Sequence, residues 1–546
     1  MRIFSSRVFA WGFWEVALIM LLALAFRLIQ LDESRHPDDY YHLMAAASWL
    51  REGTLSIGGD EPYDRAYLFT YLVAVFQGLF GETTYVARLP AVMAGVAWVV
   101  VLFLWVRSVA GRSAAWVAAL LFCFDSGSLA LAHMVRFYTL HGLVFFLGAI
   151  GLYYLVVKRP NWGGTALIGV TVIAALSLAY HLQLTTVIGG VALIVWLAVE
   201  LFPRALAYLI NYRSKAVVFG APVLALGLFS GLVLLQFDVL AAYWARFSSV
   251  PMWAEATGED LAYYFRILNG RYPVLWALFP LAALIAIAKG GRPAIFAFVL
   301  FTVPFILHSL AAFKAERFLG YAMPFFFATW GIAIGLLFPK LKAIAKEALV
   351  SVIRVQPPER VLAVAASGVL IVVMASLILT NKTLWSSVYR VVVQTELPSH
   401  MRHPNWDKAV PLLRPYLDSV EVVLASGGGP PFYHLDRVHA VVHAEYLGGR
   451  PEFSFSDRLG LPVISSADSL ELLIRCHKSG LVVIDRYRWG QYWGVSEEFI
   501  EALVMRADPV QLPEEWGVRA YTWRHDQRVT DRSDCPDLEA RKTPWS

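Results

Sequence analysis

The amino-acid sequence predicts a mainly α-helical membrane protein with a hydrophilic α/β domain at its C-terminus. The chain of 546 residues is 58% hydrophobic and only 16% charged, so it carries more apolar surface than a water-soluble globule can bury. About eleven apolar runs have the roughly 20 residues that are needed to cross a bilayer. After residue 381, charged residues return at the frequency of a soluble domain. These observations indicate a helical core in lipid followed by a domain in water.

The apolar runs and the loops between them predict the orientation of the chain. The runs begin near Trp11, Tyr85, Ser113, Tyr138, Gly163, Leu184, Ala216, Tyr272, Pro293, Phe318 and Val361. If the N-terminus is cytoplasmic, the short loops rich in Lys and Arg all lie inside, as the positive-inside rule requires. An odd number of helices then places the C-terminal domain outside. The first run is too long for a signal peptide, so we expect it to be a retained helix.

We expect two domains: a transmembrane core over residues 1–381, which includes a first outer loop at 32–84, and an outer soluble domain over 382–546. Strand-like runs at 420–425 and 481–484 predict an α/β fold for the outer domain. The Gly- and Pro-rich stretch at 427–431 lacks the spacing of a phosphate-binding loop and indicates a turn. Cys476 and Cys535 both fall in this domain, where a disulfide or two free thiols would be equally compatible with the sequence.

Composition and motifs argue against several function classes. The net charge of +5 is small for this length, and no basic stretch is regularly interleaved with aromatic residues, so we expect no nucleic-acid partner. The chain has neither a CxxC pair nor an HExxH motif, which leaves redox and metalloprotease chemistry without support.

Two adjacent carboxylates, Asp38 and Asp39, follow the first apolar run and precede an amphipathic helical pattern. A carboxylate at the membrane surface can take the proton from a sugar-acceptor hydroxyl as that hydroxyl attacks an anomeric carbon. The second acid could bind a metal, orient the acceptor or cap the following helix. Helix capping or a solvated loop would also explain the pair, and Asp32 and Glu33 form a competing acidic pair nearby.

Several basic residues fall on the outer face, where the positive-inside rule disfavours them. Arg136 lies in a short turn between two apolar runs, and Lys314 and Arg317 lie in another. Arg65 and Arg88 are weaker candidates of the same kind. These cations could stabilise the phosphate of a lipid-linked sugar as its glycosidic bond breaks, although interfacial snorkelling of long basic side chains is the alternative.

Two further residues are candidates for contacting a sugar. His181 lies in an outer turn and could bond to sugar hydroxyls, although an interfacial histidine that is satisfied by the protein is the simpler interpretation. Tyr41 follows the acidic pair and is a second candidate for substrate contact.

The order of these motifs resembles the GT-C superfamily of membrane glycosyltransferases, in particular the branch of protein O-mannosyltransferases and the lipid A aminoarabinose transferase. The resemblance covers roughly residues 1–340. It rests on the Arg-containing end of the first helix (23–28), the acidic pair with tyrosine (37–41), the stretches 79–81 and 87–90, the basic turn 136–138 and the segment 314–324. The family pattern more often has Asp-Glu where this chain has Asp-Asp.

The resemblance implies a GT-C-like fold, a polyprenyl-phosphate sugar donor that arrives from the membrane, and an acid of the first outer loop as general base. It assigns that role to Asp38, with Asp39 as the fallback. It implies no required cofactor, although a pair of aspartates leaves Mg or Mn binding open.

The sequence thus predicts a multi-pass enzyme that transfers a hexosyl or pentosyl group at the periplasmic face of a bacterial inner membrane. The acceptor could be a glycan, a lipid or a protein. The alternatives are a ligase or polymerase that uses a polyprenyl-diphosphate glycan, a lipid or sugar transporter, and an inactive assembly subunit. We find no repeat symmetry of the kind that many transporters show.

Overall fold

The computed structural model describes residues 6–29, 31, 38–58, 62–158, 160–211, 254–352, 404–435, 437–447, 449–456, 459–486, 489, 495–526, 535–538 and 541–542, with isolated positions between 358 and 368. Its contacts divide the chain into two compact units. The membrane unit contains residues 1–29, 92–132 and 138–394, and the outer unit contains residues 30–91, 133–137 and 395–546. Each unit is described by itself below.

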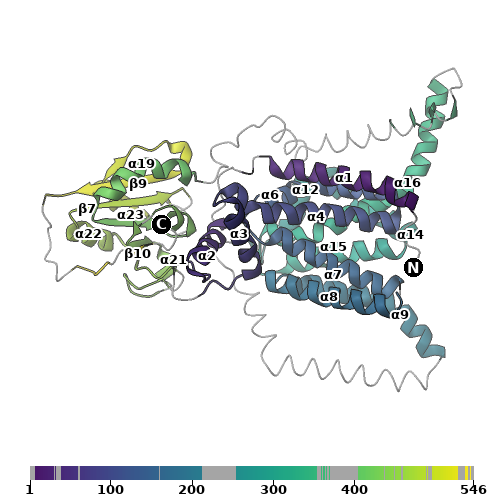
Figure 1. Cartoon of the computed structure of the whole chain (residues 1–546), viewed down its shortest axis with the longest axis horizontal. Helices are drawn as coiled ribbons and strands as arrows, with labels where there is room; N and C mark the ends of the chain where they lie inside the picture. The colour runs from purple at the N-terminus through teal and green to yellow at the C-terminus, as the bar shows by residue number, and fades with distance from the viewer. Residues whose placement is uncertain are drawn as a thin grey trace. The chain divides into compact units, whose positions relative to one another are not determined.

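In its described residues the membrane unit is built of helices (Figure 1), together with one short pair of strands. Its helices are α1 (Ser6–Leu28), the greater part of α4 (Thr84–Ala110), α5 (Arg112–Cys123), α6 (Ser126–Ala132), α7 (Tyr138–Lys158), α8 (Trp162–Leu182), α9 (Thr186–Asn211), α12 (Tyr263–Arg271), α13 (Pro273–Ala277), α14 (Phe279–Gly290), α15 (Arg292–Leu310) and α16 (Met323–Val352). Strands β1 (Ala256–Thr257) and β2 (Phe313–Lys314) pair antiparallel, and the short 3-10 helices η1 (Glu316–Phe318) and η2 (Gly320–Ala322) lead into α16.

Six of the described helices are long and apolar enough to cross a membrane, and a seventh span results if α5 and α6, bent by 59°, are taken together. The predicted membrane class therefore holds, whereas the predicted count of eleven spans is not confirmed. The run that begins near Ala216 lies outside the described residues, as does most of the run that begins near Val361.

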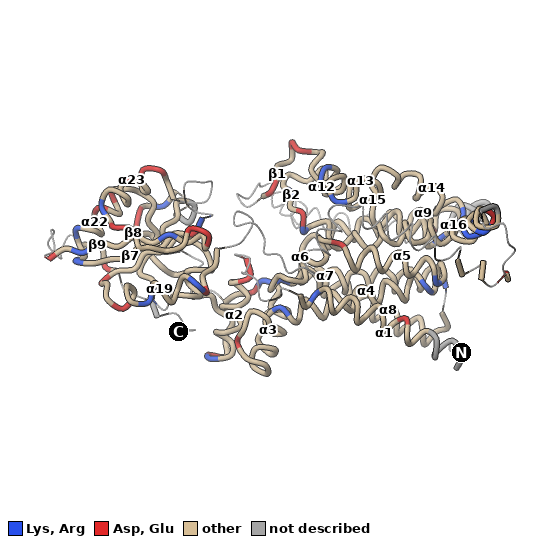
Figure 2. Tube along the Cα trace, turned by 90° about the horizontal axis from the view of Figure 1, so that it is seen from above, with Lys and Arg blue, Asp and Glu red and all other residues tan. Residues whose placement is uncertain are grey.

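Small residues let α16 pack closely against α5. A Cβ atom added at Gly331 of α16 would lie 2.5 Å from the carbonyl oxygen of Ala114 in α5, and one added at Gly335 would lie 2.7 Å from the Ala114 Cβ. Glycines spaced by four residues let two helix backbones approach in this way within a membrane. Large apolar side chains such as Leu167 and Ile173 point outward from α8. Figure 2 shows that the long helices carry few charged residues along most of their length.

The outer unit combines two helices of the first outer loop with a C-terminal mixed sheet. The loop helices are α2 (Asp39–Glu52) and α3 (Tyr67–Phe80). The sheet has the order β6-β5-β3-β7-β9-β8, in which β6, β5, β3 and β7 run parallel and β9 and β8 pair antiparallel. Its strands are β3 (Val422–Ser426), β5 (Ala440–Val442), β6 (Val463–Ile464), β7 (Ser479–Asp485), β8 (Asp508–Val510) and β9 (Val518–Arg524), and a separate pair joins β4 (Arg437–Val438) to β10 (Arg541–Lys542).

Helices pack on this sheet in two apolar clusters. The helices are α19 (Trp406–Ser419), α20 (Gly429–His434), α21 (Ala444–Leu447), α22 (Ala467–Cys476) and α23 (Glu497–Arg506), with a short 3-10 helix, η4 (Glu514–Trp516). Leu473 and Phe499, from α22 and α23, lie in one cluster. Met44 of α2 and Leu413 of α19 lie in the other, so the helix that carries the acidic pair shares a core with the C-terminal residues.

The predicted domains and the compact units have different boundaries. The outer loop 32–84 was predicted to belong to the transmembrane core, whereas contacts group residues 30–91 with residues 395–546. The apolar face of α2 explains this grouping, since Met44, Ala45 and Ala47 are buried in the same cluster as Trp406. The predicted boundary at residue 381 lies outside the described residues.

Two details of the outer unit answer questions that the sequence left open. Cys476 and Cys535 form a disulfide, with their Cα atoms 5.7 Å apart. Residues 427 and 428 form a bend, with Gly428 at a φ of 118°, and residues 429–431 are the first residues of α20. A Cβ atom at Gly429 would lie 2.6 Å from the Tyr40 Cβ, so glycine is needed for α20 to approach α2.

Candidate active site

The two adjacent aspartates have different environments. Asp38 occupies the N-cap position of α2, and its side chain remains 33% exposed. The Asp38 side chain makes no capping hydrogen bond to the backbone of α2, so helix capping does not account for it. The Asp39 side chain is fully buried. Only the first acid of the pair is therefore exposed to solvent.

Asp39 holds two distant parts of the outer unit against α2. Its Oδ1 accepts a hydrogen bond from the backbone N–H of Val135 at 2.9 Å, and its Oδ2 lies 3.6 Å from Nη2 of Arg88. Arg88 is itself buried and donates from Nη1 to the carbonyl of Leu31 at 2.7 Å. A buried charge is tolerated when it is paired and hydrogen-bonded in this way. The predicted substrate-binding residue Arg88 is thus a partner of Asp39.

Arg136 lies beside Asp38. Its Nη2 is 3.8 Å from Oδ2 of Asp38, and its Nη1 donates to the Asp38 carbonyl at 3.3 Å. The Arg136 guanidinium is buried and lies 5.3 Å from the ring centroid of Phe137. Arg65 is exposed and approaches the same ring at 5.8 Å. The outer unit therefore places two cations over one aromatic ring, and one of them lies beside a partly exposed carboxylate.

His42 and Tyr63 complete this cluster, and neither was among the residues predicted from the sequence. Nδ1 of His42 lies 2.8 Å from Oγ1 of Thr70, and its ring makes edge contacts with the rings of Tyr63 and Phe137. The buried Nε2 of His42 and the buried hydroxyl of Tyr63 have no hydrogen-bond partner among the described residues. Leaving such a group unsatisfied costs about 1–3 kcal/mol, so a cluster of them indicates a place for a polar ligand.

The protonation states of these two residues follow from their surroundings. Burial, followed by the charges of Arg136 and Arg65, holds the pKa of His42 well below its usual value, so the imidazole is neutral at physiological pH. Burial raises the pKa of Tyr63, so its hydroxyl stays protonated. His42 follows Asp38 by four residues, a spacing that places two side chains on the same side of a helix, and this was the available sequence signal.

The other tyrosines near the acidic pair face the C-terminal part of the outer unit. The Tyr40 hydroxyl lies 3.1 Å from Nε2 of His434 in α20, and the Trp406 ring stacks on His434. Tyr41, a predicted substrate contact, is partly buried and packs against the apolar cluster of Met44 and Leu413. These contacts attach the N-terminal turn of α2 to α19 and α20.

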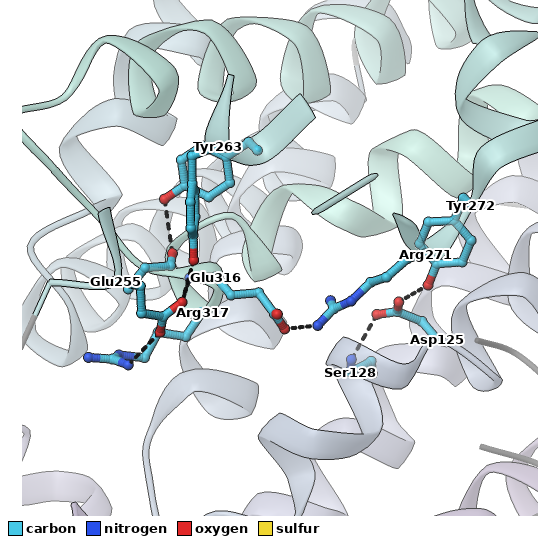
Figure 3. Close-up of polar contacts among 10 residues, drawn as sticks. Asp125, Ser128, Glu255, Tyr263, Arg271, Tyr272, Glu316 and Arg317 are labelled. Carbon is cyan, nitrogen blue, oxygen red and sulfur yellow. Dashed lines mark hydrogen bonds and ion pairs between the residues drawn. The ribbon is translucent and has the colours of Figure 1, made fainter. Parts of the chain in front are cut away.

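The predicted cations Lys314 and Arg317 lie in the membrane unit, in the turn that follows α15. Lys314 is buried and donates from Nζ to the carbonyls of Thr257 at 2.6 Å and Ala311 at 3.0 Å, so it stabilises the β1–β2 pair. Burial lowers the pKa of Lys314. Arg317 instead pairs with the carboxylate of Glu255, which lies 3.2 Å from its Nη1 (Figure 3).

A second polar network lies near this turn. Asp125 falls at the break between α5 and α6, where it accepts hydrogen bonds from the Tyr272 hydroxyl and from the backbone N–H of Ser128 (Figure 3). Arg271 forms an ion pair with Glu316. The predicted sugar contact His181 lies in the last turn of α8. In the part of the chain that the structure describes, no group of three or more His, Cys, Asp or Glu residues is arranged to hold a metal ion.

Comparisons with known proteins identify the fold. No protein-family model and no curated protein sequence matches the chain. The structure is similar to that of ArnT from Cupriavidus metallidurans, crystallised with undecaprenyl phosphate, with 15% identity over 94% of this chain and 98% of ArnT and a TM-score of 0.59. It is also similar to the archaeal oligosaccharyltransferase AglB from Archaeoglobus fulgidus, in complex with an inhibitory peptide and a dolichol-phosphate. There the identity is 13% over 92% of this chain and 73% of AglB, with a TM-score of 0.57.

ArnT, a lipid A aminoarabinose transferase, and AglB are both members of the GT-C superfamily. The match to each covers most of this chain, including residues from both compact units. The fold that the ordered sequence motifs predict is therefore confirmed, and the chain has the fold of the GT-C membrane glycosyltransferases.

Proposed function

We propose that this protein is a membrane glycosyltransferase that moves a sugar from a polyprenyl-phosphate donor to a hydroxyl acceptor, with Asp38 as the general base. The observation that carries the proposal is the difference between the two aspartates. Asp39 is fully buried and is held by Arg88 and by the N–H of Val135, whereas Asp38 remains one-third exposed beside Arg136. An accessible carboxylate can receive the proton of an acceptor hydroxyl, and the cation beside it can attract an anionic substrate.

The proposed reaction breaks one bond and forms another. The acceptor oxygen attacks the anomeric carbon of the sugar, and its proton passes to a carboxylate oxygen of Asp38. The bond between the anomeric carbon and the phosphate oxygen breaks, and its electron pair leaves with the polyprenyl phosphate. Asp38 later returns the proton to solvent.

Arginine residues would stabilise the phosphate, because negative charge grows on the leaving group as the glycosidic bond breaks. Arg136 is the first candidate, since it lies beside Asp38, and Arg65 is an exposed cation at the same aromatic ring. Arg317 is the candidate in the membrane unit. Lys314 has a lesser role in this proposal, because its ammonium group is already bonded to two carbonyls.

His42 and Tyr63 would contact hydroxyl groups of the sugar or of the acceptor. Each offers a buried polar atom that has no partner among the described residues, and both are neutral. A neutral donor or acceptor suits a hydroxyl group better than a phosphate. Pockets that hydrogen-bond to substrate hydroxyls discriminate strongly against analogues that lack them.

We propose that the outer unit faces the periplasm of a bacterial cell. The basic loops favour this orientation, and the disulfide between Cys476 and Cys535 is typical of an oxidising compartment. The transferred group, a hexosyl or pentosyl unit, and the glycan, lipid or protein acceptor are to be identified by experiment.

The test is to identify the lipids that remain bound to the protein after purification. Mass spectrometry of the wild type and of Asp38→Asn, purified in the same detergent, should find polyprenyl-phosphate sugar enriched on the variant and free polyprenyl phosphate on the wild type. Asp39→Asn is an unsuitable control because it disturbs a buried pair, so Asp64→Asn, at an exposed residue of the same loop, is the matched control. Identical lipid on both proteins would rule out Asp38 as the base, and the absence of polyprenyl lipid would favour a transporter or a scaffold.

A further inference from the structure

The carboxylate of Glu255 accepts hydrogen bonds from three donors in the membrane unit. Its Oε2 is bonded by the Tyr263 hydroxyl of α12 and by the backbone N–H of Glu316 at 3.0 Å, and its Oε1 lies 3.2 Å from Nη1 of Arg317 (Figure 3). A guanidinium, a phenol and a backbone amide that converge on one point form the donor set of an anion site. In this structure the chain's own carboxylate fills the site.

The three donors are held in place independently of Glu255. The Arg317 side chain is only 15% exposed and lies 5.6 Å from the Phe318 ring. The neighbouring Glu316 pairs with Arg271 through its side chain. The Tyr263 ring packs against the ring of Tyr264, whose hydroxyl donates to the Ala315 carbonyl at 2.9 Å. Burial and the hydrogen bond to Glu255 both raise the pKa of Tyr263, so its hydroxyl remains a donor over the physiological range.

Glu255 is the member of this group that can leave most easily. Its side chain is 40% exposed, more than that of Arg317. Its backbone stays in place because its N–H donates to the Lys314 carbonyl at 2.9 Å, beside the β1–β2 pair. A change of side-chain rotamer would therefore open the anion site without unfolding the strand pair.

We propose that Arg317, Tyr263 and the N–H of Glu316 bind the phosphate group of a lipid carrier, and that Glu255 fills this site until the phosphate displaces it. This inference rests on the proposed function, which assigns Arg317 to the donor phosphate. To that assignment it adds two further hydrogen-bond donors, Tyr263 and the N–H of Glu316. It also adds Glu255 as a group of the same chain that competes with the phosphate.

The exchange follows from the charges of the competing groups. A sugar phosphodiester carries one negative charge, whereas the phosphate monoester left after transfer carries about −1.5 to −2 at pH 7. The anion site therefore favours the leaving group over the intact donor, which stabilises the bond-breaking step. The return of Glu255 to Arg317 then competes with the product and assists its release.

The test measures binding of undecaprenyl phosphate to the full chain in nanodiscs, with inorganic phosphate as a separate ligand. Removing the charge at Glu255 with Glu255→Gln should tighten undecaprenyl phosphate binding roughly two- to fivefold, the range expected for an exposed ion pair. Glutamine keeps the hydrogen-bond acceptor, so the loop should fold normally. Glu259→Gln is the matched control, because it removes the same charge from an exposed residue of the same loop and should leave the affinity unchanged.

A double-mutant cycle separates competition from a structural role. Arg317→Ala should weaken binding, and adding Glu255→Gln to Arg317→Ala should give a smaller gain than it gives in the wild type, because Glu255 competes with the phosphate for Arg317 and that competition is lost when Arg317 is absent. Inorganic phosphate should bind at least tenfold more weakly than the lipid.

Three results would overturn the inference. Weaker or unchanged binding by Glu255→Gln, together with a loss on Arg317→Ala, would reject displacement and leave the proposed function standing. Equal affinity for inorganic phosphate would show that the site takes free phosphate. Absence of undecaprenyl phosphate binding in every variant would reject this inference and the lipid-linked donor together.

Discussion

Replacing Asp39 by asparagine should destabilise the protein far more than the same change at Asp38. The Asp39 carboxylate is fully buried, and its partner Arg88 is 3% exposed, so the substitution removes the counter-charge that Asp39 supplies to a buried guanidinium. Breaking a buried pair from one side costs about 3–5 kcal/mol. Asparagine can still accept the hydrogen bond from the N–H of Val135, so the loss is mainly electrostatic. Asp38 is one-third exposed, and its substitution should cost at most about 1 kcal/mol.

The assay is thermal unfolding of the purified variants in one detergent. At about 2–4 °C per kcal/mol for a unit of this size, Asp39→Asn should lower the midpoint by roughly 6–20 °C, and Asp38→Asn by no more than about 4 °C. Arg88→Met combined with Asp39→Asn should recover part of the loss, because both buried charges are then absent. Equal midpoints for Asp38→Asn and Asp39→Asn would refute the division of roles between the two acids.

Two further predictions concern stability. The folded-state pKa of His42 lies well below 6.5 and burial lowers that of His439 to about 4, so the unfolded chain binds more protons as the pH falls below 6.5. The contribution of these two histidines to the free energy of unfolding should therefore be complete above that pH. Below it, the free energy of unfolding should fall by up to about 1.4 kcal/mol per pH unit per histidine. His42→Gln should make the thermal unfolding midpoint less dependent on pH between pH 7 and pH 5. An unchanged pH dependence would contradict the lowered pKa of His42. Removing the disulfide with Cys476→Ser should cost about 4 kcal/mol, given the sequence separation of 59 between the two cysteines, whereas Cys123→Ser should leave the sensitivity to reductant unchanged. A wild-type midpoint that does not respond to reductant would contradict this prediction.

The helical membrane core was predictable because apolar runs of spanning length are visible in any single sequence. The packing partner of α2 could not be predicted from the sequence. Met44, Ala45 and Ala47 show that α2 has an apolar face, but periodicity does not say that this face meets Trp406, more than three hundred and fifty residues later in the chain. The sequence-based domain assignment therefore placed the outer loop with the membrane core.

The candidate site was predictable in its residue types and less so in its arrangement. The sequence identified the acidic pair, but the burial of Asp39 depends on the N–H of Val135, 96 residues away. Likewise, Arg317 stood out as a cation on the outer face, but its partner Glu255 lies 62 residues earlier. Contacts between distant residues set burial and pairing, and a local motif does not encode them.

The central claim, that Asp38 is the base for transfer from a lipid-linked sugar, is tested most directly by turnover. Purified protein in nanodiscs would be given a lipid extract that contains polyprenyl-phosphate sugars, and mass spectrometry would follow the appearance of free polyprenyl phosphate. We expect conversion by the wild type, and a rate lower by about 10²–10⁴-fold in Asp38→Asn with donor binding retained. Conversion by Asp38→Asn at the wild-type rate would contradict the account.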